Sequence, residues 1–172
     1  MSTRALISRP LISVEEYLAS SYKPDCDYVD GHIEERNLGE RPHSRMQGRL
    51  IVLLNGQAAS GAEVLPEVRV QVKPSRFRVP DICIAVDHSD DPILTKPPFL
   101  CIEVLSPEDR MSRIEARIKD YLEMGVAYVW VLDPQTKQAY VATAPEGLRE
   151  VKTGVLTTAN PAFEIPLAEV FR

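Results

Sequence analysis

The sequence predicts an α/β (α+β) fold in which a mixed central β-sheet is flanked by helices. Two dense apolar runs, at 79–86 and 99–105, have the length and composition of central strands covered on both faces. A helix with an apolar stripe is expected after the second run, and a third apolar run follows it at 126–132. A strand–helix–strand unit of this kind needs a crossover, and so favours a parallel pair within a mixed sheet.

The chain has the size of one compact domain. Its 172 residues are 44% hydrophobic and 26% charged, which is an ordinary balance for a globular protein. A chain of roughly 150 residues buries about two-thirds of its unfolded surface, so the core needs no disulfide or structural metal. We expect residues 11–172 to form a single domain, preceded by a loose tail at 1–10.

A short helix and a hairpin are expected near the start of the chain. Ser13 and Glu16 have the spacing of a capping box, which predicts a helix that runs through Ser20. Asp30-Gly31 supplies the positive φ values of a tight turn and so predicts a hairpin. Its strands are expected at 27–29 and 32–35.

The middle of the chain is predicted to form a helix and a half-buried strand. From about 44 to 59, apolar residues recur with the spacing of one helix face. In 67–73 three valines alternate with polar residues, which predicts a strand with one buried face. With the dense apolar runs, the expected order from 44 to 132 is helix, three strands, helix, strand.

The second long helix follows the second dense run. Ser106 is expected to cap it, with Pro107 in its first position and Asp109 completing the capping box. Gly125 supplies its C-terminal stop. The predicted apolar stripe comprises Met111, Ile114, Ile118, Tyr121 and Leu122. Short strands at 138–143 and 148–152 and a final helix at 167–171 are expected beyond it.

Composition excludes several classes of protein. The formal net charge of −5 argues against an indiscriminate DNA coat protein, although local basic stripes can coexist with acidic metal ligands. The three cysteines have no paired short spacing, which disfavours a zinc site or a disulfide framework. Because no apolar stretch approaches the roughly 20 residues that span a bilayer and no signal peptide is recognisable, we expect a cytoplasmic protein without a membrane partner.

Two carboxylates stand inside the dense apolar runs. Asp81 follows Pro80 in the first run, and Glu103 lies within the second. An ionised carboxylate in such a strand is costly to desolvate unless it is paired or binds a metal, and two on adjacent strands repel each other. Mg²⁺ takes oxygen ligands and would remove that repulsion. Solvation at the strand ends, or pairing with an arginine, is the alternative explanation.

Several short motifs occur in order along the chain. They are Asp27-Tyr28-Val29-Asp30-Gly31, His43 at the start of a helix, Pro80-Asp81, Glu103-Val104-Leu105-Ser106-Pro107, Lys119-Asp120-Tyr121, Gly125-Val126 and Tyr128-Val129-Trp130-Val131-Leu132-Asp133-Pro134. This set, spanning about residues 13–171, resembles the Uma-type restriction endonuclease family of the PD-(D/E)XK nuclease superfamily. The resemblance implies a restriction-endonuclease-like core and a metal-dependent endonuclease that hydrolyses nucleic-acid phosphodiester bonds.

The resemblance also implies a metal site. Asp81 and Glu103 would ligate Mg²⁺ (or Mn²⁺) and act in catalysis. The carbonyl of Val104 would be a further ligand. Asp27 is equally compatible with a third, water-mediated ligand and with a solvated hairpin residue.

One position departs from the superfamily pattern. Leu105 stands where the superfamily has a catalytic lysine. Lys119, on the following helix, is the expected replacement, and would orient the attacking water or stabilise charge on the phosphate. The alternative for Lys119 is a helical ion pair with Glu115.

The implied partner is nucleic acid, with DNA favoured. Basic side chains can hold its phosphates without reading bases, and the candidates are His43, Arg45, Arg78 and Arg113. Each basic stripe can also be a solvated helix face. A homodimer is expected, because duplex cleavage by a single-site nuclease favours a symmetric pair. A nuclease fold that has lost turnover and serves as a binding or interaction module is the alternative function.

Overall fold

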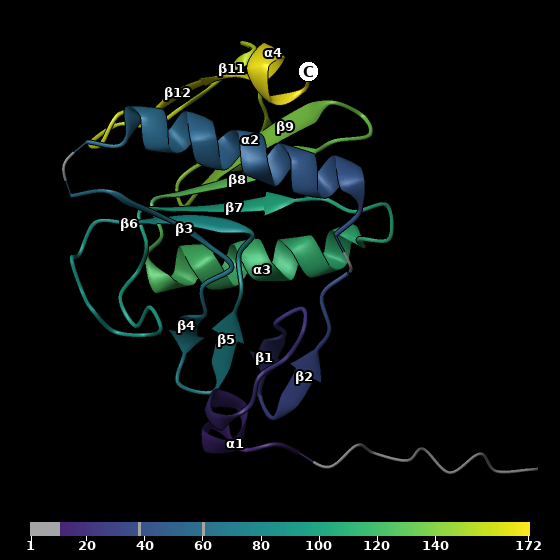
Figure 1. Ribbon diagram of the computed structural model, residues 1–172, viewed down its shortest axis with the longest axis vertical. Helices are drawn as coiled ribbons and strands as arrows, with labels where there is room; N and C mark the ends of the chain where they lie inside the picture. The colour runs from purple at the N-terminus through teal and green to yellow at the C-terminus, as the bar shows by residue number, and fades with distance from the viewer. Residues whose placement is uncertain (1–10, 38, 60) are drawn as a thin grey trace, which may run out of the picture.

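The computed structural model describes residues 11–37, 39–59 and 61–172, so the tail expected at 1–10 lies outside the described residues. Helices separate runs of consecutive strands along these ranges (Figure 1). The helices are α1 (Val14–Ala19), α2 (Arg41–Gln57), α3 (Met111–Met124) and α4 (Leu167–Val170). The strands are β1 (Asp27–Val29), β2 (His32–Glu34), β3 (Glu63–Pro66), β4 (Val70–Lys73), β5 (Arg76–Arg78), β6 (Ile82–Ala85), β7 (Leu100–Val104), β8 (Tyr128–Asp133), β9 (Gln138–Thr143), β10 (Gly147–Glu150), β11 (Val155–Thr157) and β12 (Glu164–Pro166).

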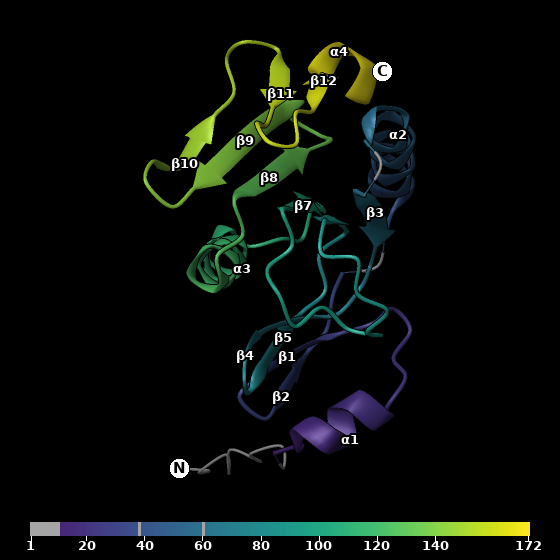
Figure 2. The same ribbon diagram turned by 90° about the vertical axis from the view of Figure 1, so that its left-hand side faces the viewer.

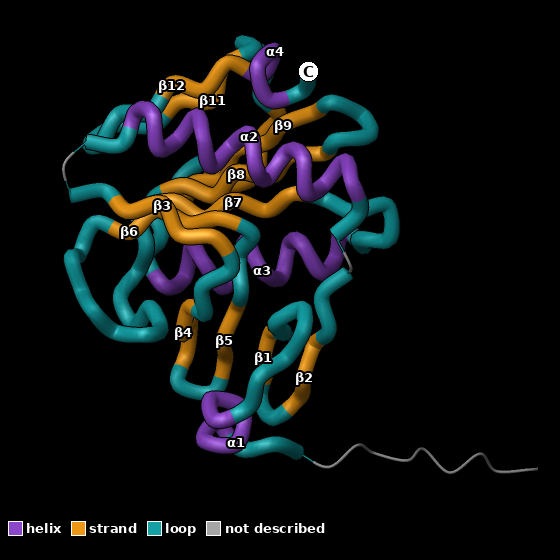
Figure 3. Tube along the Cα trace, viewed as in Figure 1, coloured by secondary structure: helices purple, strands orange, loops and turns teal. Residues whose placement is uncertain are grey.

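The described strands form a large mixed sheet, a small antiparallel sheet and a two-stranded ribbon (Figure 3). The large sheet has the order β10-β9-β8-β7-β6-β3, the small sheet β2-β1-β5-β4, and the ribbon pairs β11 with β12. The expected fold class is confirmed. None of the helices in the described ranges has both the length and the apolar character needed to cross a membrane.

Helices α2 and α3 cover opposite faces of the large sheet (Figures 1 and 2). Because successive side chains of a strand point to opposite faces, each central strand contributes to two separate cores. Ile102 and Trp130 belong to the core on the α2 side, whereas Cys101 and Val131 belong to the core on the α3 side. The position of a residue along β6, β7 or β8 therefore fixes which helix it faces.

The predicted strand–helix–strand crossover is confirmed. β7 and β8 pair in parallel, with Val104 opposite Leu132, and α3 connects them. α3 ends at Gly125 as expected, with φ of 108° in the left-handed region that favours glycine. The carboxyl ends of β7 and β8 therefore lie at the same edge of the large sheet, on the side toward which the β7 arrow points in Figure 1.

The start of α3 differs from the prediction. The helix begins at Met111, and its N-cap is Arg110, not Ser106. Ser106 and Asp109 instead close a turn before the helix, in which the Ser106 N–H donates to the Asp109 carboxylate at 2.7 Å. Such local side-chain bonds to the backbone compete with helix formation. Met111 consequently lies in an exposed first turn and is not part of the buried stripe.

The short strands were the main omission of the sequence analysis. β3, β5, β11 and β12 were not predicted, so the described chain has five strands between α2 and α3 where three were expected. Each is only three or four residues long, which is too short for a reliable period-two pattern. The alternation predicted in 67–73 is confirmed for the part that forms β4, where Val70 and Val72 are buried. The hairpin at Asp30-Gly31 is also confirmed, and Ser13 is the N-cap of α1, with its side chain accepting the Glu16 N–H.

Candidate active site at the carboxyl edge of the sheet

Asp81 and Glu103 lie beside each other on one face of the large sheet. β6 and β7 are antiparallel with Ile82 opposite Ile102, so the next pair outward is Asp81 and Glu103. Because side chains two residues apart along a strand share a face, both acids lie on the face of Cys101, which α3 covers. The two carboxylates are 3% and 2% exposed. The structure therefore brings together the two acids that the sequence analysis singled out.

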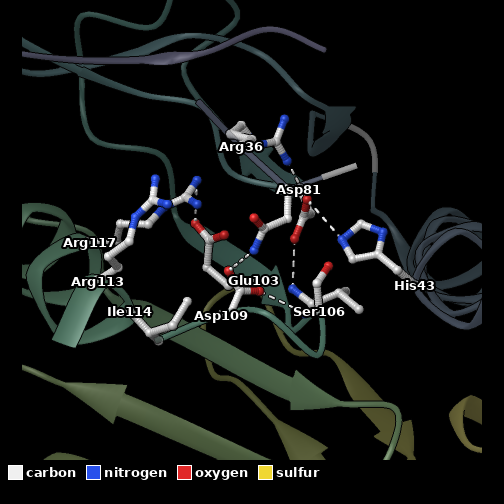
Figure 4. Close-up of a pocket in the computed structure, with 11 residues that line it drawn as sticks. Arg36, His43, Asp81, Glu103, Ser106, Asp109, Arg113, Ile114 and Arg117 are labelled. Carbon is white, nitrogen blue, oxygen red and sulfur yellow. Dashed lines mark hydrogen bonds and ion pairs between the residues drawn. The ribbon is translucent and has the colours of Figure 1, made fainter. Parts of the chain in front are cut away.

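Both acids line a cavity of about 30 Å³ that opens at the carboxyl end of β7 (Figure 4). The start of α2, the segment after β2 and the first turns of α3 form its other walls. Its lining residues are Arg36, Asn37, His43, Asp81, Glu103, Val104, Ser106, Asp109, Arg113, Ile114 and Arg117. In open α/β sheets, the carboxyl ends of the strands are the usual place for a ligand site.

Cations surround Asp81. Its Oδ1 accepts a hydrogen bond from the Arg36 guanidinium and lies 3.3 Å from Nε2 of His43. Its Oδ2 accepts the backbone N–H of Val104 at 2.7 Å. Burial opposes ionisation of this carboxyl, but His43 and Arg36 outweigh it and hold the pKa of Asp81 below its usual range. Burial likewise lowers the pKa of His43, but its contact with Asp81 prevails and the net shift is upward.

Glu103 has a different environment, because its partners come from α3. Its Oε1 accepts a hydrogen bond from the Tyr121 hydroxyl at 2.6 Å and lies 3.2 Å from Nη2 of Arg117. Burial raises the pKa of Glu103 to about 7; Arg117 opposes this shift and the charge of Asp81 adds to it. The pKa values of two neighbouring carboxyls are thus displaced in opposite directions, a pattern that is enriched at functional sites.

Arg117 also contacts two residues that do not line the cavity. Its Nη2 also donates to the carbonyl of Val79 at 2.7 Å, and its Nε lies 3.6 Å from Oδ2 of Asp27. The sequence analysis did not single out Arg117. Helical spacing was the missed signal, because Arg117 lies three residues after Ile114 and four before Tyr121, both of which are buried.

Lys119 does not reach the acids. Its side chain is 73% exposed, and its Nζ lies 3.7 Å from Glu123 on the next turn of α3. Two residues along a helix correspond to a rotation of about 200°, so Arg117 and Lys119 point in nearly opposite directions. The placement expected for Lys119 is therefore wrong, and Arg117 is the α3 cation that contacts Glu103. The ion pair of Lys119 is with Glu123 and not with Glu115.

Asp27 and Arg78 belong to a buried ionic network behind the cavity. Oδ1 of Asp27 accepts the Val79 N–H at 2.9 Å, and its Oδ2 lies 3.0 Å from Arg78 Nη1. Arg78 also contacts Glu34 and Asp120. Asp27 is fully buried and does not line the cavity, and Arg78 is 3% exposed. Asp27 and Arg78 therefore do not lie where a metal ligand and a phosphate contact were expected, because neither lines the cavity.

The remaining predicted phosphate contacts divide into two groups. His43 and Arg113 line the cavity, and Arg113 Nη2 donates to the Glu35 carbonyl at 2.9 Å. Arg45 is exposed and lines a separate pocket on the other side of the start of α2. Arg36 was missed altogether, because it lies in a segment after β2 without any periodic pattern.

The oxygen donors of the cavity fit a hard divalent cation with few protein ligands. In the described part of the chain, no group of three or more His, Cys, Asp or Glu side chains is arranged to hold a metal. Mg²⁺ commonly uses one or two carboxylates and keeps several waters, which matches Asp81 and Glu103. Both contacts of Glu103 fall on Oε1, so Oε2 is its oxygen available to a further ligand. Because Arg36 is paired with Asp81, its guanidinium would compete with such a cation for this carboxylate.

Comparison with known proteins gives a consistent result. The model of a family named Uma2 and described as "Putative restriction endonuclease" matches residues 14–168. A solved structure described as a "putative nuclease" from Anabaena variabilis is similar with a TM-score of 0.81 and 20% identity, over 93% of this chain and 97% of that chain. Comparison with the curated proteins gave no match. At this level of identity the structural similarity supports the fold alone.

Proposed function

The chain belongs to the Uma2 family, described as putative restriction endonucleases, and we propose from this that it is a metal-dependent endonuclease acting on the phosphodiester bonds of nucleic acid, with DNA as the favoured substrate. One observation carries the proposal. Asp81 and Glu103, both buried, share one face of the sheet and one cavity, and the pKa of Glu103 is raised to about 7. One or two carboxylates are the protein ligands that Mg²⁺ commonly uses, so this pair supports a metal site.

Asp81 and Glu103 would hold the Mg²⁺ (or Mn²⁺), with the carbonyl of Val104 as a further oxygen ligand. When bound, the ion supplies Lewis-acid stabilisation of charge on the phosphate and lowers the pKa of a coordinated water. The protein keeps both carboxylates in position before substrate arrives, through the Val104 N–H on Asp81 and the Tyr121 hydroxyl on Glu103. Preorganised groups avoid reorganisation at the moment of reaction.

The arginines of the cavity would stabilise the phosphate. Arg117 takes the role that the sequence analysis gave to Lys119, because its Nη2 lies 3.2 Å from Glu103 and its side chain is only 11% exposed. A guanidinium stays protonated throughout the accessible pH range, so Arg117 acts as a cation and hydrogen-bond donor, not as a general acid. Arg113 and Arg36 line the same cavity and add positive charge.

Two further features belong to the proposal. The described part of the chain has one such cavity. A single active site would cut one strand at a time, so cleavage of both strands of a duplex would use two copies in a symmetric homodimer. We also propose that the protein acts in the cytoplasm, the location expected from its sequence.

A binding module without turnover is the second candidate function. It is favoured by Arg36 and His43, which already neutralise Asp81, and by Leu105 at the position of the superfamily lysine. In that case the charge pairs would serve stability and not metal binding. It predicts DNA or protein binding without metal-dependent cleavage.

A cleavage assay separates the two candidates. Supercoiled plasmid and single-stranded DNA are incubated with Mg²⁺ or Mn²⁺, with a chelator as the blank. We expect metal-dependent cleavage that falls at least about a hundredfold in Asp81→Asn and in Glu103→Gln, because each removes a charged ligand. Lys119→Ala, on the exposed side of α3, is the matched control and should cleave like the natural protein. Cleavage that survives Asp81→Asn unchanged discards the metal site.

A further inference from the structure

A second pocket, of about 210 Å³, lies close to the candidate active site. Its walls are the first turns of α2, the turn between β8 and β9, and the end of α4 with the residues that follow it. The charged side chains that line it are Arg45, Arg49, Lys137 and Arg172. Within the described ranges no acidic side chain contributes to this lining. A basic pocket of this kind stands out on a chain whose formal net charge is −5.

The four cations are not equally free to meet a ligand. Arg49 Nη1 donates to the carbonyl of Val170 at 3.2 Å and to the backbone oxygen of Arg172, so the last residue of α4 and the chain after it engage its guanidinium. Arg45 and Lys137 are exposed. Both therefore present their charge to solvent at the mouth of the pocket, where an anion would be bound.

The basic pocket and the active-site cavity share the same edge of the large sheet. Pro42 and Arg45 line the basic pocket, whereas His43, between them in the first turn of α2, lines the active-site cavity. Pro134 of the basic pocket directly follows β8, whose carboxyl end lies beside that of β7. The two sites thus lie on either side of the start of α2, at the end of the sheet toward which β7 points in Figure 1.

We propose that the basic pocket binds the phosphodiester backbone of the nucleic-acid strand, at a phosphate adjacent to or a few nucleotides from the one in the active-site cavity. This inference rests on the proposed function and specifies how its substrate is held. Each strand of a duplex carries one negative charge per about 3.4 Å of helix axis, so a strand that enters the cavity brings further phosphates past the start of α2. Contacts to such phosphates fix the register of the strand without reading its sequence.

The test is a binding measurement made without metal, so that cleavage does not enter it. Fluorescence anisotropy of a labelled single strand and of a duplex is followed as a function of salt, for the natural chain and for the double variant Arg45→Glu/Lys137→Glu. Binding should weaken at least about tenfold. The slope of log K against log salt is negative, and it should become shallower by about 1.4 for the single strand and about 1.8 for the duplex, the amounts expected when two phosphate contacts are lost.

The matched control carries the same change of charge elsewhere. Lys96→Glu/Lys119→Glu alters an exposed residue at the amino end of β7 and another on the outer side of α3. It should retain the affinity and the salt slope almost unchanged. Thermal unfolding shows whether each variant is folded, and Arg45→Gln/Lys137→Gln replaces the charge reversal if that variant does not fold.

Three outcomes overturn the inference. The first is a variant that binds like the natural chain, the second is an equal loss in the control pair, and the third is a natural chain that binds neither oligonucleotide at low salt. The proposed function is judged separately, by cleavage in Mg²⁺ and its loss in Asp81→Asn. DNA that is bound through Arg45 and Lys137 but never cleaved would support the basic pocket and contradict the nuclease.

Discussion

Glu103 is a carboxyl placed in the interior of an apolar strand. Its neighbours along β7 are buried hydrophobic residues, and its only ionic partner among the described residues is Arg117, at 3.2 Å. Burial outweighs that pairing, so the pKa of Glu103 rises to about 7. Asp81, immediately before the neighbouring strand β6, has two cationic partners and its pKa falls. The contrast between the two acids is set by the side chains around them and not by the strands that carry them.

The raised pKa of Glu103 predicts how stability depends on pH. The folded state holds this proton more tightly than the unfolded chain, whose ordinary value is 4.5, so the stabilisation is full below about pH 4.5 and is lost as the pH rises through about 7. Glu103→Gln lacks this loss. Its stability relative to the natural chain should therefore increase by about 1–3 kcal/mol between about pH 5 and about pH 8. Urea unfolding without metal measures the difference. A difference that stays constant or shrinks with pH would contradict the environment described for Glu103.

Arg36 is predicted to compete with the metal for Asp81. Replacing it with alanine leaves a buried carboxylate with one cationic partner fewer, so a divalent cation should bind more tightly, by about three- to tenfold. Calorimetric titration with Mn²⁺ measures the affinity. Arg113→Ala is the control, because Arg113 lines the same cavity but donates to the Glu35 carbonyl and not to Asp81. Weaker binding in Arg36→Ala would mean that Arg36 orients the carboxylate for the metal.

At the scale of elements, α3 does most to organise the site. It places Arg117 and Tyr121 on Glu103, and it connects the parallel strands β7 and β8. Its C-terminal end was predictable, because Gly125 is a specific signal for a helix stop. Its start was not, because the Ser106-x-x-Asp109 spacing of a capping box also fits the turn that the two residues form.

The C-terminal end of α3 gives a stability prediction. Gly125 has φ of 108°, and an added Cβ would lie 3.4 Å from Cγ of Pro97. Gly125→Ala should therefore destabilise the protein by about 1–2 kcal/mol. Gly48→Ala is the matched control, since Gly48 lies inside α2 with no atom near its added Cβ. It should stabilise by about 0.5–1 kcal/mol. Urea unfolding of the two variants tests the pair, and equal effects would argue against the left-handed cap.

At the scale of the whole molecule, the central sheet, its two acids and the cavity residues His43 and Arg113 could be predicted, whereas the arginines that pair with the acids, Arg36 and Arg117, could not. The dense runs that form β6, β7 and β8 carry strong local patterns, and Asp81 and Glu103 stand out because acids are rare in them. The partners of these acids come from distant parts of the chain: Arg36 lies 45 residues from Asp81. No local pattern records such contacts. The same holds for the network in which Arg78 reaches across 51 residues to Asp27.

The account depends on two acids that share one cation at the carboxyl edge of the sheet. The most direct measurement is a crystal structure of the protein soaked in Mn²⁺, with the ion located by its anomalous scattering. We predict one peak between the carboxylates of Asp81 and Glu103, with Arg36 displaced from Asp81 and no peak there in crystals of Asp81→Asn. Crystals that take up Mn²⁺ elsewhere, while Arg36 and Asp81 remain paired, would contradict the metal site and the nuclease proposed from it.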